Sequence, residues 1–336
     1  MQIIIPMAGK GKRMRPHTLT TAKPLIPVGG KPIVQRLVED ITKVCGQKVE
    51  EIAFVIGPDF GAEVEQNLIK VAESQGAKGS IYYQTEALGT AHAIMCAKGA
   101  IKGKTVVAFA DTLFKADFIM DTNQDGVIWV QKIEDPRQFG VVKLNSNNVI
   151  TDFVEKPQEF VSNLAIIGIY YFKDGDNLKK ELQYLLDNKI MEKGEYQLTN
   201  ALENMKQKGL QLKPGQVTEW LDCGNKDATV YTNQRVLEFD KGKKELKGKD
   251  IKNNGSIIIE PCYIGNNVEL VNSVVGPHVS IGNNTKVDNS ILKNSIIQSD
   301  VKLKNANVCN SMIGIGAEVT GKYMDLSISD YTQLIV

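Results

Sequence analysis

Apolar positions in the first hundred residues alternate between two patterns. Gln2 to Met7, Ile52 to Ile56 and Lys104 to Ala110 are short, nearly continuous apolar runs, which predict strands buried on both faces. Between them, apolar residues from 33 to 44 and from 61 to 73 recur every three or four positions, as in amphipathic helices. This alternation predicts a doubly wound, Rossmann-like α/β fold with a parallel sheet.

The texture changes between residues 126 and 172, where four strand-like segments follow one another. They predict an antiparallel subdomain joined to the first sheet, so that the complete sheet is mixed. Helical spacing returns at 176–188, 197–208 and 225–239. The charged stretch 241–250 has little to bury and is typical of a linker.

Beyond the linker, aliphatic residues recur every five or six positions, and every third one recurs after 16 or 17 residues. Neither a helix nor an ordinary strand has this period, whereas a parallel β-helix with three short strands per coil does. Asn-containing corners such as "IGNN" support this interpretation. The chain therefore divides into a first domain at 1–245 and a β-helix at 252–325. The repeating positions are Ile264, Leu270, Val275, Ile281, Val287, Leu292, Ile297, Leu303, Val308, Ile313 and Val319.

Composition excludes several classes of protein. Lys and Arg number 40 against 39 Asp and Glu, a net charge of +1, which argues against a nucleic-acid partner or an anionic membrane surface. The longest apolar stretch is far shorter than the ~20 residues that span a bilayer. The five cysteines are scattered, without a CxxC pair, which favours a reduced, cytoplasmic protein over a disulfide framework or a zinc site.

A basic loop follows the first predicted strand. The segment "MAGKGKRMRPHTLTTAKPL" contains two glycines, Gly9 and Gly11. It also contains several basic residues, including Arg13 and Lys23, and no acidic residue. Met14 stands where the Rossmann and Walker A fingerprints require glycine, so neither motif is present. A tight glycine turn with cations can still cradle phosphate through its backbone N–H groups. A solvated basic loop is the other interpretation.

Five segments in order resemble the sugar-1-phosphate nucleotidylyltransferases, a family that includes the glucose-1-phosphate thymidylyltransferases. They are the basic loop with "AKPLIPVGGKPIV", "YQTEALGTAHAI", "VVAFAD", "FGVVKLNSNNVITDFVEKP" and "EWLDCGN". The resemblance covers residues 1–240, and several members of the family also carry a left-handed β-helix at the C-terminus. Lys12 departs from the pattern, because relatives usually have serine or threonine before the arginine.

The resemblance implies a nucleotide site and its chemistry. Gln84, where the GDP-mannose enzymes commonly have glutamate, favours UTP or dTTP over GTP. Asp111 and Asp222 would together hold Mg²⁺, which prefers one or two carboxylates with phosphate oxygens and water. Taken singly, each aspartate could be a helix cap or a turn, and Thr90 could be a helix cap. The implied nucleotide-binding residues are Ala8, Gly9, Gly11, Lys12, Arg13, Gln84, Leu88, Gly89, Thr90 and Asp111.

The resemblance also implies a sugar-phosphate site at Gly140, Glu155, Lys156 and Gly168. Many relatives have threonine before the last of these glycines, and this chain has Ile167, so the sugar stays open. The implied catalytic residues are Arg13, Lys23, Asp111, Lys156 and Asp222.

These residues predict one reaction between a nucleoside triphosphate and a hexose 1-phosphate. The sugar phosphate attacks the α-phosphorus, pyrophosphate leaves, and an NDP-sugar forms, by positioning and charge neutralisation alone. One alternative is a non-catalytic regulatory or assembly subunit of the same fold. Another is a bifunctional enzyme whose β-helix transfers an acyl group with His278 as base. We expect the β-helix to join copies of the chain into a homo-oligomer.

Overall fold

The computed structural model describes residues 1–322, and residues 323–325 of the predicted β-helix lie outside this range. The chain divides into two compact units. The first contains Met1–Ile26 and Lys31–Thr229, and the second contains Pro27–Gly30 and the chain from Val230 onward. The second unit is therefore made of two separate pieces of sequence. None of the helices within residues 1–322 has the length and hydropathy that a bilayer crossing requires.

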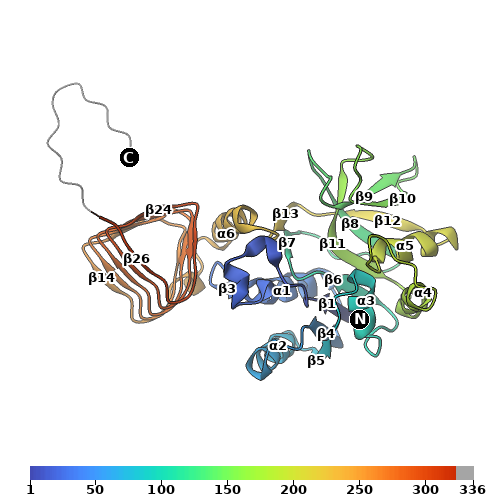
Figure 1. Cartoon of the computed structure of the whole chain (residues 1–336), viewed down its shortest axis with the longest axis horizontal. Coiled ribbons are helices and arrows are strands. Elements are labelled where there is room, and N and C mark those ends of the chain that lie inside the picture. The colour runs from blue at the N-terminus through green and yellow to red at the C-terminus, as the bar shows by residue number, and fades with distance from the viewer. Residues whose placement is uncertain (323–336) are drawn as a thin grey trace. The chain divides into compact units, whose positions relative to one another are not determined.

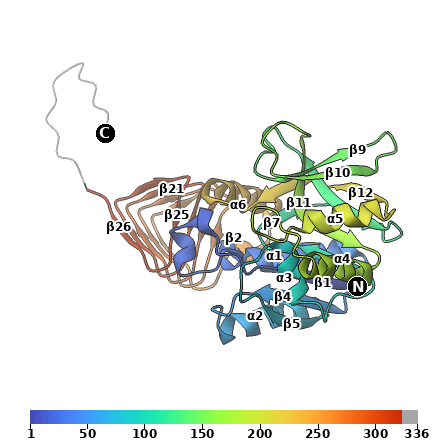
Figure 2. The ribbon, with the colours of Figure 1, turned by 45° about the vertical axis from the view of Figure 1, so that its right-hand side comes forward.

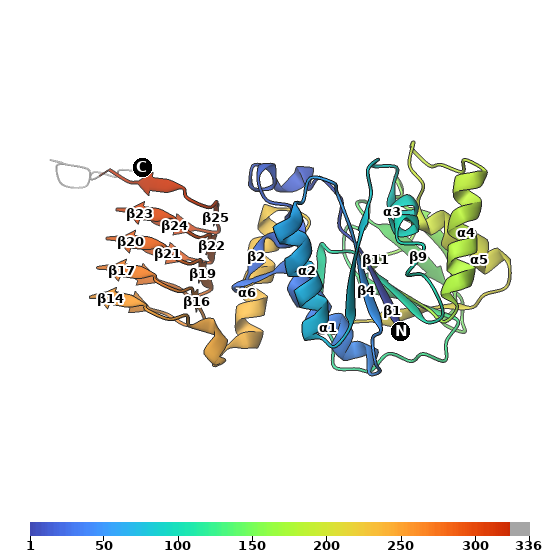
Figure 3. The same ribbon diagram turned by 90° about the horizontal axis from the view of Figure 1, so that it is seen from below.

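The first unit is built on a nine-stranded mixed sheet, as predicted. The strands β6, β1, β4 and β5 lie side by side and run parallel. Figure 3 shows helices α1 and α2 on one side of this sheet and α3 and α4 on the other. The elements are β1 (Gln2–Pro6), α1 (Ile33–Cys45), β4 (Glu51–Ile56), α2 (Ala62–Ser74), β5 (Lys78–Tyr83), α3 (Thr90–Cys96) and β6 (Thr105–Ala108).

The predicted antiparallel part extends the same sheet from β6 through β11. β11 also pairs antiparallel with β8, and β9 and β10 form an antiparallel hairpin at one end of the sheet, as Figure 2 shows. The elements are β8 (Gly126–Lys132), β9 (Gly140–Leu144), β10 (Ile150–Glu155), β11 (Leu164–Phe172), α4 (Gly175–Asp187), α5 (Leu198–Gln207) and β12 (Leu212–Gln216).

Several short elements of this unit carry no periodic signal in the sequence. β7 (Thr112–Lys115) and β13 (Glu219–Asp222) form a separate two-stranded antiparallel sheet. Strand β6 ends at Ala108, earlier than the apolar run predicts, because the chain turns there and Thr112 N–H donates to Phe109 O. The remaining elements are η1 (Lys12–Met14), η2 (His17–Leu19), η3 (Lys23–Leu25) and β3 (Lys31–Pro32).

The second unit contains the predicted parallel β-helix, whose stacked coils are visible in Figure 1. Up to residue 322, its strands form three parallel sheets of five, four and four strands. Besides β2 (Pro27–Val28), the unit contains the following elements in chain order. They are α6 (Lys226–Asp240, beginning in the first unit), η4 (Lys244–Leu246), β14 (Lys252–Asn254), β15 (Ile257–Ile258), β16 (Tyr263–Ile264), β17 (Glu269–Val271), β18 (Val274–Val275), β19 (Val279–Ile281), β20 (Lys286–Asp288), β21 (Ile291–Lys293), β22 (Ser295–Ile297), β23 (Lys302–Lys304), β24 (Asn307–Cys309), β25 (Met312–Ile313) and β26 (Glu318–Thr320).

The repeated aliphatic residues stack into ladders inside the β-helix. On one sheet Ile264 pairs with Ile281, Ile281 with Ile297 and Ile297 with Ile313. Ile264, Ile281 and Ile297 are almost completely buried. Asparagines at the corners adopt left-handed backbone angles, which Asn tolerates better than most residues. They are Asn267, Asn272, Asn284, Asn289, Asn294, Asn305 and Asn310.

The prediction of a free linker at 241–250 is wrong in part. Leu246 is buried, and the backbone N–H of Gly248 donates to Ile264 O at 2.7 Å. A Cβ on Gly248 would lie 2.5 Å from the carbonyl carbon of Gly265. This segment therefore packs on the first coil of the β-helix. The many charged residues around Leu246 and Gly248 hide this packing in the sequence pattern.

The ladder predicts how the β-helix responds to a cavity. We expect Ile281→Ala to lower the free energy of unfolding of this unit by about 2–5 kcal/mol, because the side chain is fully buried between two coils. Urea titration followed by circular dichroism measures the change. Lys286→Ala, on the exposed face of the neighbouring sheet, should change it by less than about 0.5 kcal/mol. Equal effects of the two substitutions would contradict the ladder as the source of stability.

Candidate active site

The basic loop leaves strand β1 and turns sharply at Gly11. Gly11 has a φ of 55°, and a Cβ there would lie 3.0 Å from Thr18 Cγ2 and 3.1 Å from Lys23 Cβ. Glycine is therefore needed at this position both for the turn and for the close approach. Gly9 has no such requirement, since nothing lies within 4 Å of a Cβ built on it. Lys12 is exposed in the short helix η1 that follows.

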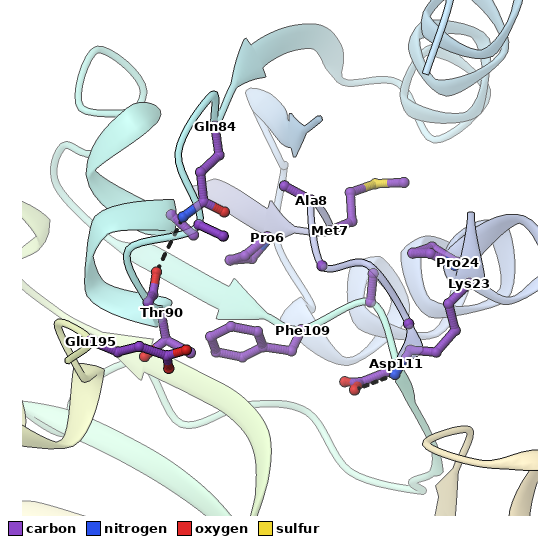
Figure 4. Close-up of a pocket in the computed structure, with 16 residues that line it drawn as sticks. Pro6, Met7, Ala8, Lys23, Pro24, Gln84, Thr90, Phe109, Asp111 and Glu195 are labelled. Atoms are coloured by element: carbon purple, nitrogen blue, oxygen red, sulfur yellow. Dashed lines mark hydrogen bonds and ion pairs between the residues drawn. The ribbon is translucent and has the colours of Figure 1, made fainter. Parts of the chain in front are cut away.

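Lys23 and Asp111 form an ion pair at the centre of the site. Lys23 Nζ lies 2.7 Å from Asp111 Oδ2, and Figure 4 shows the two side chains pointing toward each other. The Lys23 side chain is only 13% exposed, whereas that of Asp111 is 37% exposed. Asp111 is therefore the more exposed partner of the pair, and Lys23 is the more buried one.

Asp222 is brought beside Asp111 by the small sheet of β7 and β13. In this sheet Asp222 pairs with Thr112, the residue after Asp111, and the N–H of Cys223 donates to Asp111 O at 3.0 Å. Burial raises the pKa of the Asp222 carboxyl, and the negative charge of Asp111 raises it further. Lys23 and Arg13 oppose these effects only in part. The two carboxylates therefore lie close enough for the charge of Asp111 to influence Asp222.

A first cavity, of about 270 Å³, lies between the basic loop and the start of α3. Gln84, Gly89 and Thr90 line it, together with Lys23 and Asp111, as Figure 4 shows for the labelled residues. Gly89 has a φ of 107°, and a Cβ there would lie 2.5 Å from Tyr196 O, so only glycine fits.

The other predicted nucleotide-binding residues lie at several different places in the structure. Ala8, Gly9 and Gly11 line the cavity, and Arg13 lines the neighbouring one described below. Leu88 instead packs against the hydrophobic core. The side chain is only partly buried, and its direct contact with a nucleotide stays a prediction.

A second cavity, of about 230 Å³, adjoins the first. All four predicted sugar-phosphate residues line it: Gly140, Glu155, Lys156 and Gly168. Arg13, Asp111 and Asp222 line it as well. Thr90, Phe109, Asp111 and Glu195 line both cavities. Asp111 therefore lies where the two cavities meet.

The sugar-side cavity contains polar groups that the motifs do not single out. The Thr199 hydroxyl and the Trp220 indole N–H are buried and have no hydrogen-bond partner within residues 1–322. Both residues line the second cavity, and Trp220 packs edge-on against Phe139 at 5.0 Å between ring centroids. Buried polar groups are nearly always paired, so these two side chains on the cavity wall are candidates for contact with a bound molecule. The position of Trp220 within "EWLDCGN" was a signal that could have found it.

Comparison with known proteins identifies the family of the chain. The family model described as "Nucleotidyl transferase" matches residues 2–238, which is more than half of the chain. The chain belongs to the nucleotidyl transferase family.

Relatives of this nucleotidyl transferase extend the similarity over nearly its whole length. It is 30% identical to the bifunctional protein GlmU of Methanococcus vannielii, over 94% of this chain and 78% of the relative. It is 26% identical to a glucose-1-phosphate thymidylyltransferase of Streptomyces antibioticus, over 95% and 94%. A crystal structure of UDP-glucose pyrophosphorylase with UDP-glucose shares the fold, with a TM-score of 0.58 and 22% identity over 71% of this chain and 98% of the other.

The shared carboxylate site of this nucleotidyl transferase predicts opposite pKa responses. Asp111→Asn should lower the pKa of Asp222, because it removes a neighbouring negative charge, and Lys23→Met should raise it. Titration of the aspartate side-chain carbons by NMR measures both shifts. No shift in either variant would contradict electrostatic coupling between these groups.

The same coupling sets a pH dependence of stability. A raised folded-state pKa means that the folded protein binds more protons than the unfolded chain above the usual aspartate pKa. The contribution of Asp222 to stability therefore falls as the pH rises from the usual aspartate pKa through the raised pKa of Asp222. Asp111→Asn should make this fall smaller.

Proposed function

We propose that this nucleotidyl transferase joins dTTP or UTP to a hexose 1-phosphate, giving an NDP-sugar and pyrophosphate. One observation carries the proposal. Asp111 lies where two cavities meet, one lined by the predicted base-recognition segment and the other by the predicted sugar-phosphate segment. Two substrates placed in these cavities would bring their phosphates together beside Asp111 and Lys23.

The reaction needs positioning and positive charge more than a nucleophilic side chain. The sugar phosphate attacks the α-phosphorus in line, a P–O bond forms, and the bond to the leaving pyrophosphate breaks. Lys156, which is half exposed at the second cavity, orients the attacking phosphate. Lys23 neutralises charge on the α-phosphate, and Arg13 does so on the pyrophosphate. The attacking oxygen is already ionised, so no general base is required.

The pair of carboxylates fits Mg²⁺. No group of three or more His, Cys, Asp or Glu within residues 1–322 forms a metal cluster. Mg²⁺ needs only one or two carboxylates when substrate phosphates and water complete its shell. Asp111 and Asp222 both line the second cavity, where such a pair of carboxylates could contribute to a Mg²⁺ site. Bound Mg²⁺ would supply neutralisation of the triphosphate.

The choice of nucleoside rests on Gln84, which lines the first cavity and whose Nε2 donates to Gly89 O at 3.3 Å and lies 3.1 Å from His92 Nδ1. An amide carries both a donor and an acceptor, which suits the edge of a uracil or thymine base. Relatives named for thymidylyl transfer and for UDP-glucose support the same pair of nucleotides.

Four further inferences concern the whole chain. The β-helix is left-handed, as on family members with this appendage, and we place the domain limits at 1–245 and 252–325. It joins copies of the chain into a homo-oligomer. The protein acts in the cytoplasm, which its five free cysteines support.

A bifunctional enzyme is the second candidate, because the Methanococcus vannielii relative is named bifunctional. His278, the expected base for acyl transfer, does not favour it. Its Nε2 lies 2.5 Å from Glu238 Oε1, and the side chain is only 15% exposed. The convergence of Lys23, Asp111 and Asp222 likewise disfavours a non-catalytic subunit.

The reaction predicts pyrophosphate release with a defined substrate pair. We expect turnover with dTTP or UTP, a hexose 1-phosphate and Mg²⁺, and a fall in kcat of about 10²- to 10³-fold in Asp111→Asn, because one preorganised charge is lost. A coupled pyrophosphate assay over a grid of nucleotides and sugar phosphates measures both. Asp187→Asn, at the end of α4, is the control and should keep full activity. Absence of turnover with every pair would refute the proposal.

The unpaired groups of the second cavity predict a selective effect on the sugar. Thr199→Val keeps the shape of the side chain but removes its hydroxyl. We expect the KM for the sugar 1-phosphate to rise about 3- to 10-fold, the cost of one hydrogen bond, with the KM for the nucleotide unchanged. Trp220→Phe should act in the same direction. A change confined to the nucleotide KM would show that these groups do not face the sugar.

A further inference from the structure

Two segments leave the catalytic residues and enter the second unit. The chain passes from Lys23 in η3 to the turn Pro27–Gly30, which belongs to the second unit. Helix α6 begins shortly after Asp222 and runs into the second unit from Val230 onward. The segment after the catalytic lysine and the segment after the catalytic aspartate therefore both continue into the unit that carries the β-helix.

Asn233 of α6 joins these two segments. Its side chain is completely buried, and its Oδ1 accepts hydrogen bonds from Gly29 N–H at 2.9 Å and from Ser280 Oγ at 2.7 Å. Its Nδ2 donates to His278 O at 3.4 Å. One amide thus connects the turn, the helix and strand β19 of the β-helix.

The turn itself is tightly confined. Gly30 has a φ of 84°, and a Cβ there would lie 2.2 Å from the ring of Tyr263, on β16. The side-chain ring of Tyr263 is thus in close contact with the backbone of the turn. A shift of the turn would require the first coils of the β-helix to rearrange.

The chain between Lys23 and the turn is held by consecutive backbone hydrogen bonds. Within η3 and just after it, Leu25 N–H donates to Ala22 O at 2.9 Å and Ile26 N–H donates to Lys23 O at 3.1 Å. Ile26 is completely buried, and its carbonyl accepts from Ile33 N–H at 3.1 Å. Because each step is hydrogen-bonded, a displacement of the turn is transmitted to the backbone of Lys23.

The path from Asp222 to Asn233 is equally constrained. Gly224 N–H donates to Asp222 Oδ1 at 3.0 Å. Asn225 caps the start of α6 by accepting from Ala228 N–H at 3.0 Å through Oδ1 and from Thr229 Oγ1 through its backbone carbonyl at 2.7 Å. An intact helix then leads to Asn233.

We propose that Asn233 is a positioning residue for the nucleotidyl transfer. Its hydrogen bond to Gly29 N–H fixes the segment after Lys23 to the helix after Asp222, and so sets where Lys23 Nζ lies relative to the two carboxylates. This inference rests on the proposed function, in which Lys23 neutralises the α-phosphate.

Removing the amide tests the proposal. Asn233→Ala leaves Gly29 N–H without this acceptor, and we expect kcat to fall about 10- to 100-fold with little change in either KM, since a displacement of about 1 Å at a reacting centre costs this much. Asn233→Asp keeps an acceptor oxygen for Gly29 N–H and should restore most of kcat. Ser280→Ala is the matched control, because it removes the other donor to the same Oδ1 and leaves the bond to Gly29, and it should keep kcat near that of the wild type.

A second readout is independent of activity. Amide hydrogen exchange followed by mass spectrometry should show faster exchange in residues 22–32 of Asn233→Ala than of Ser280→Ala or the wild type. If Asn233→Ala does not fold, Asn233→Leu keeps the volume of the side chain and replaces it in both measurements.

The outcomes separate this inference from the proposed function. Equal kcat and equal exchange in the Asn233 and Ser280 variants would overturn the positioning role. So would a loss of stability in Asn233→Ala with kcat per folded molecule unchanged. A wild-type protein inactive with every substrate pair would refute the proposed function, and the exchange measurement would then still decide whether Asn233 holds the segment after Lys23.

Discussion

The first unit depends on keeping two like charges beside each other. Asp111 and Asp222 come from distant parts of the chain, and burial together with the charge of Asp111 raises the pKa of the Asp222 carboxyl. The short sheet of β7 and β13 enforces their proximity through backbone hydrogen bonds, which do not weaken when the side chains are charged. Lys23 relieves part of the repulsion at 2.7 Å from Asp111. Burial nevertheless leaves the pKa of the Asp222 carboxyl raised.

Much of the fold follows from periodicity, because burial on one face imposes it. Strands β1 and β4 and helices α1 and α2 were predicted from local patterns, and so was the β-helix, since each coil repeats the same demand for an inward aliphatic residue. The sheet of β7 and β13 could not be predicted in this way. Its strands are four residues long and lie far apart in the sequence, so no local period records their pairing.

The residues of the site likewise fall into those that the sequence identifies and those that it does not. Lys23, Asp111 and Asp222 could be named because family motifs flank them, and the structure brings them together. Thr199 lacked such a motif, and its role depends on what surrounds its hydroxyl rather than on its neighbours in sequence. Leu88 stands within a motif, and its partly buried side chain packs against the core. A motif marks a segment, whereas packing decides which of its side chains reach a ligand.

The bond between Gly29 and Asn233 also has a consequence for biosynthesis. The two residues are 204 positions apart, so the donor is translated long before its acceptor. During vectorial synthesis the turn after Lys23 emerges from the ribosome without its partner, and it stays incomplete until α6 and the first coils have followed. The turn after Lys23 is therefore among the first parts of the protein to be made, and the acceptor of its Gly29 N–H is made 204 residues later.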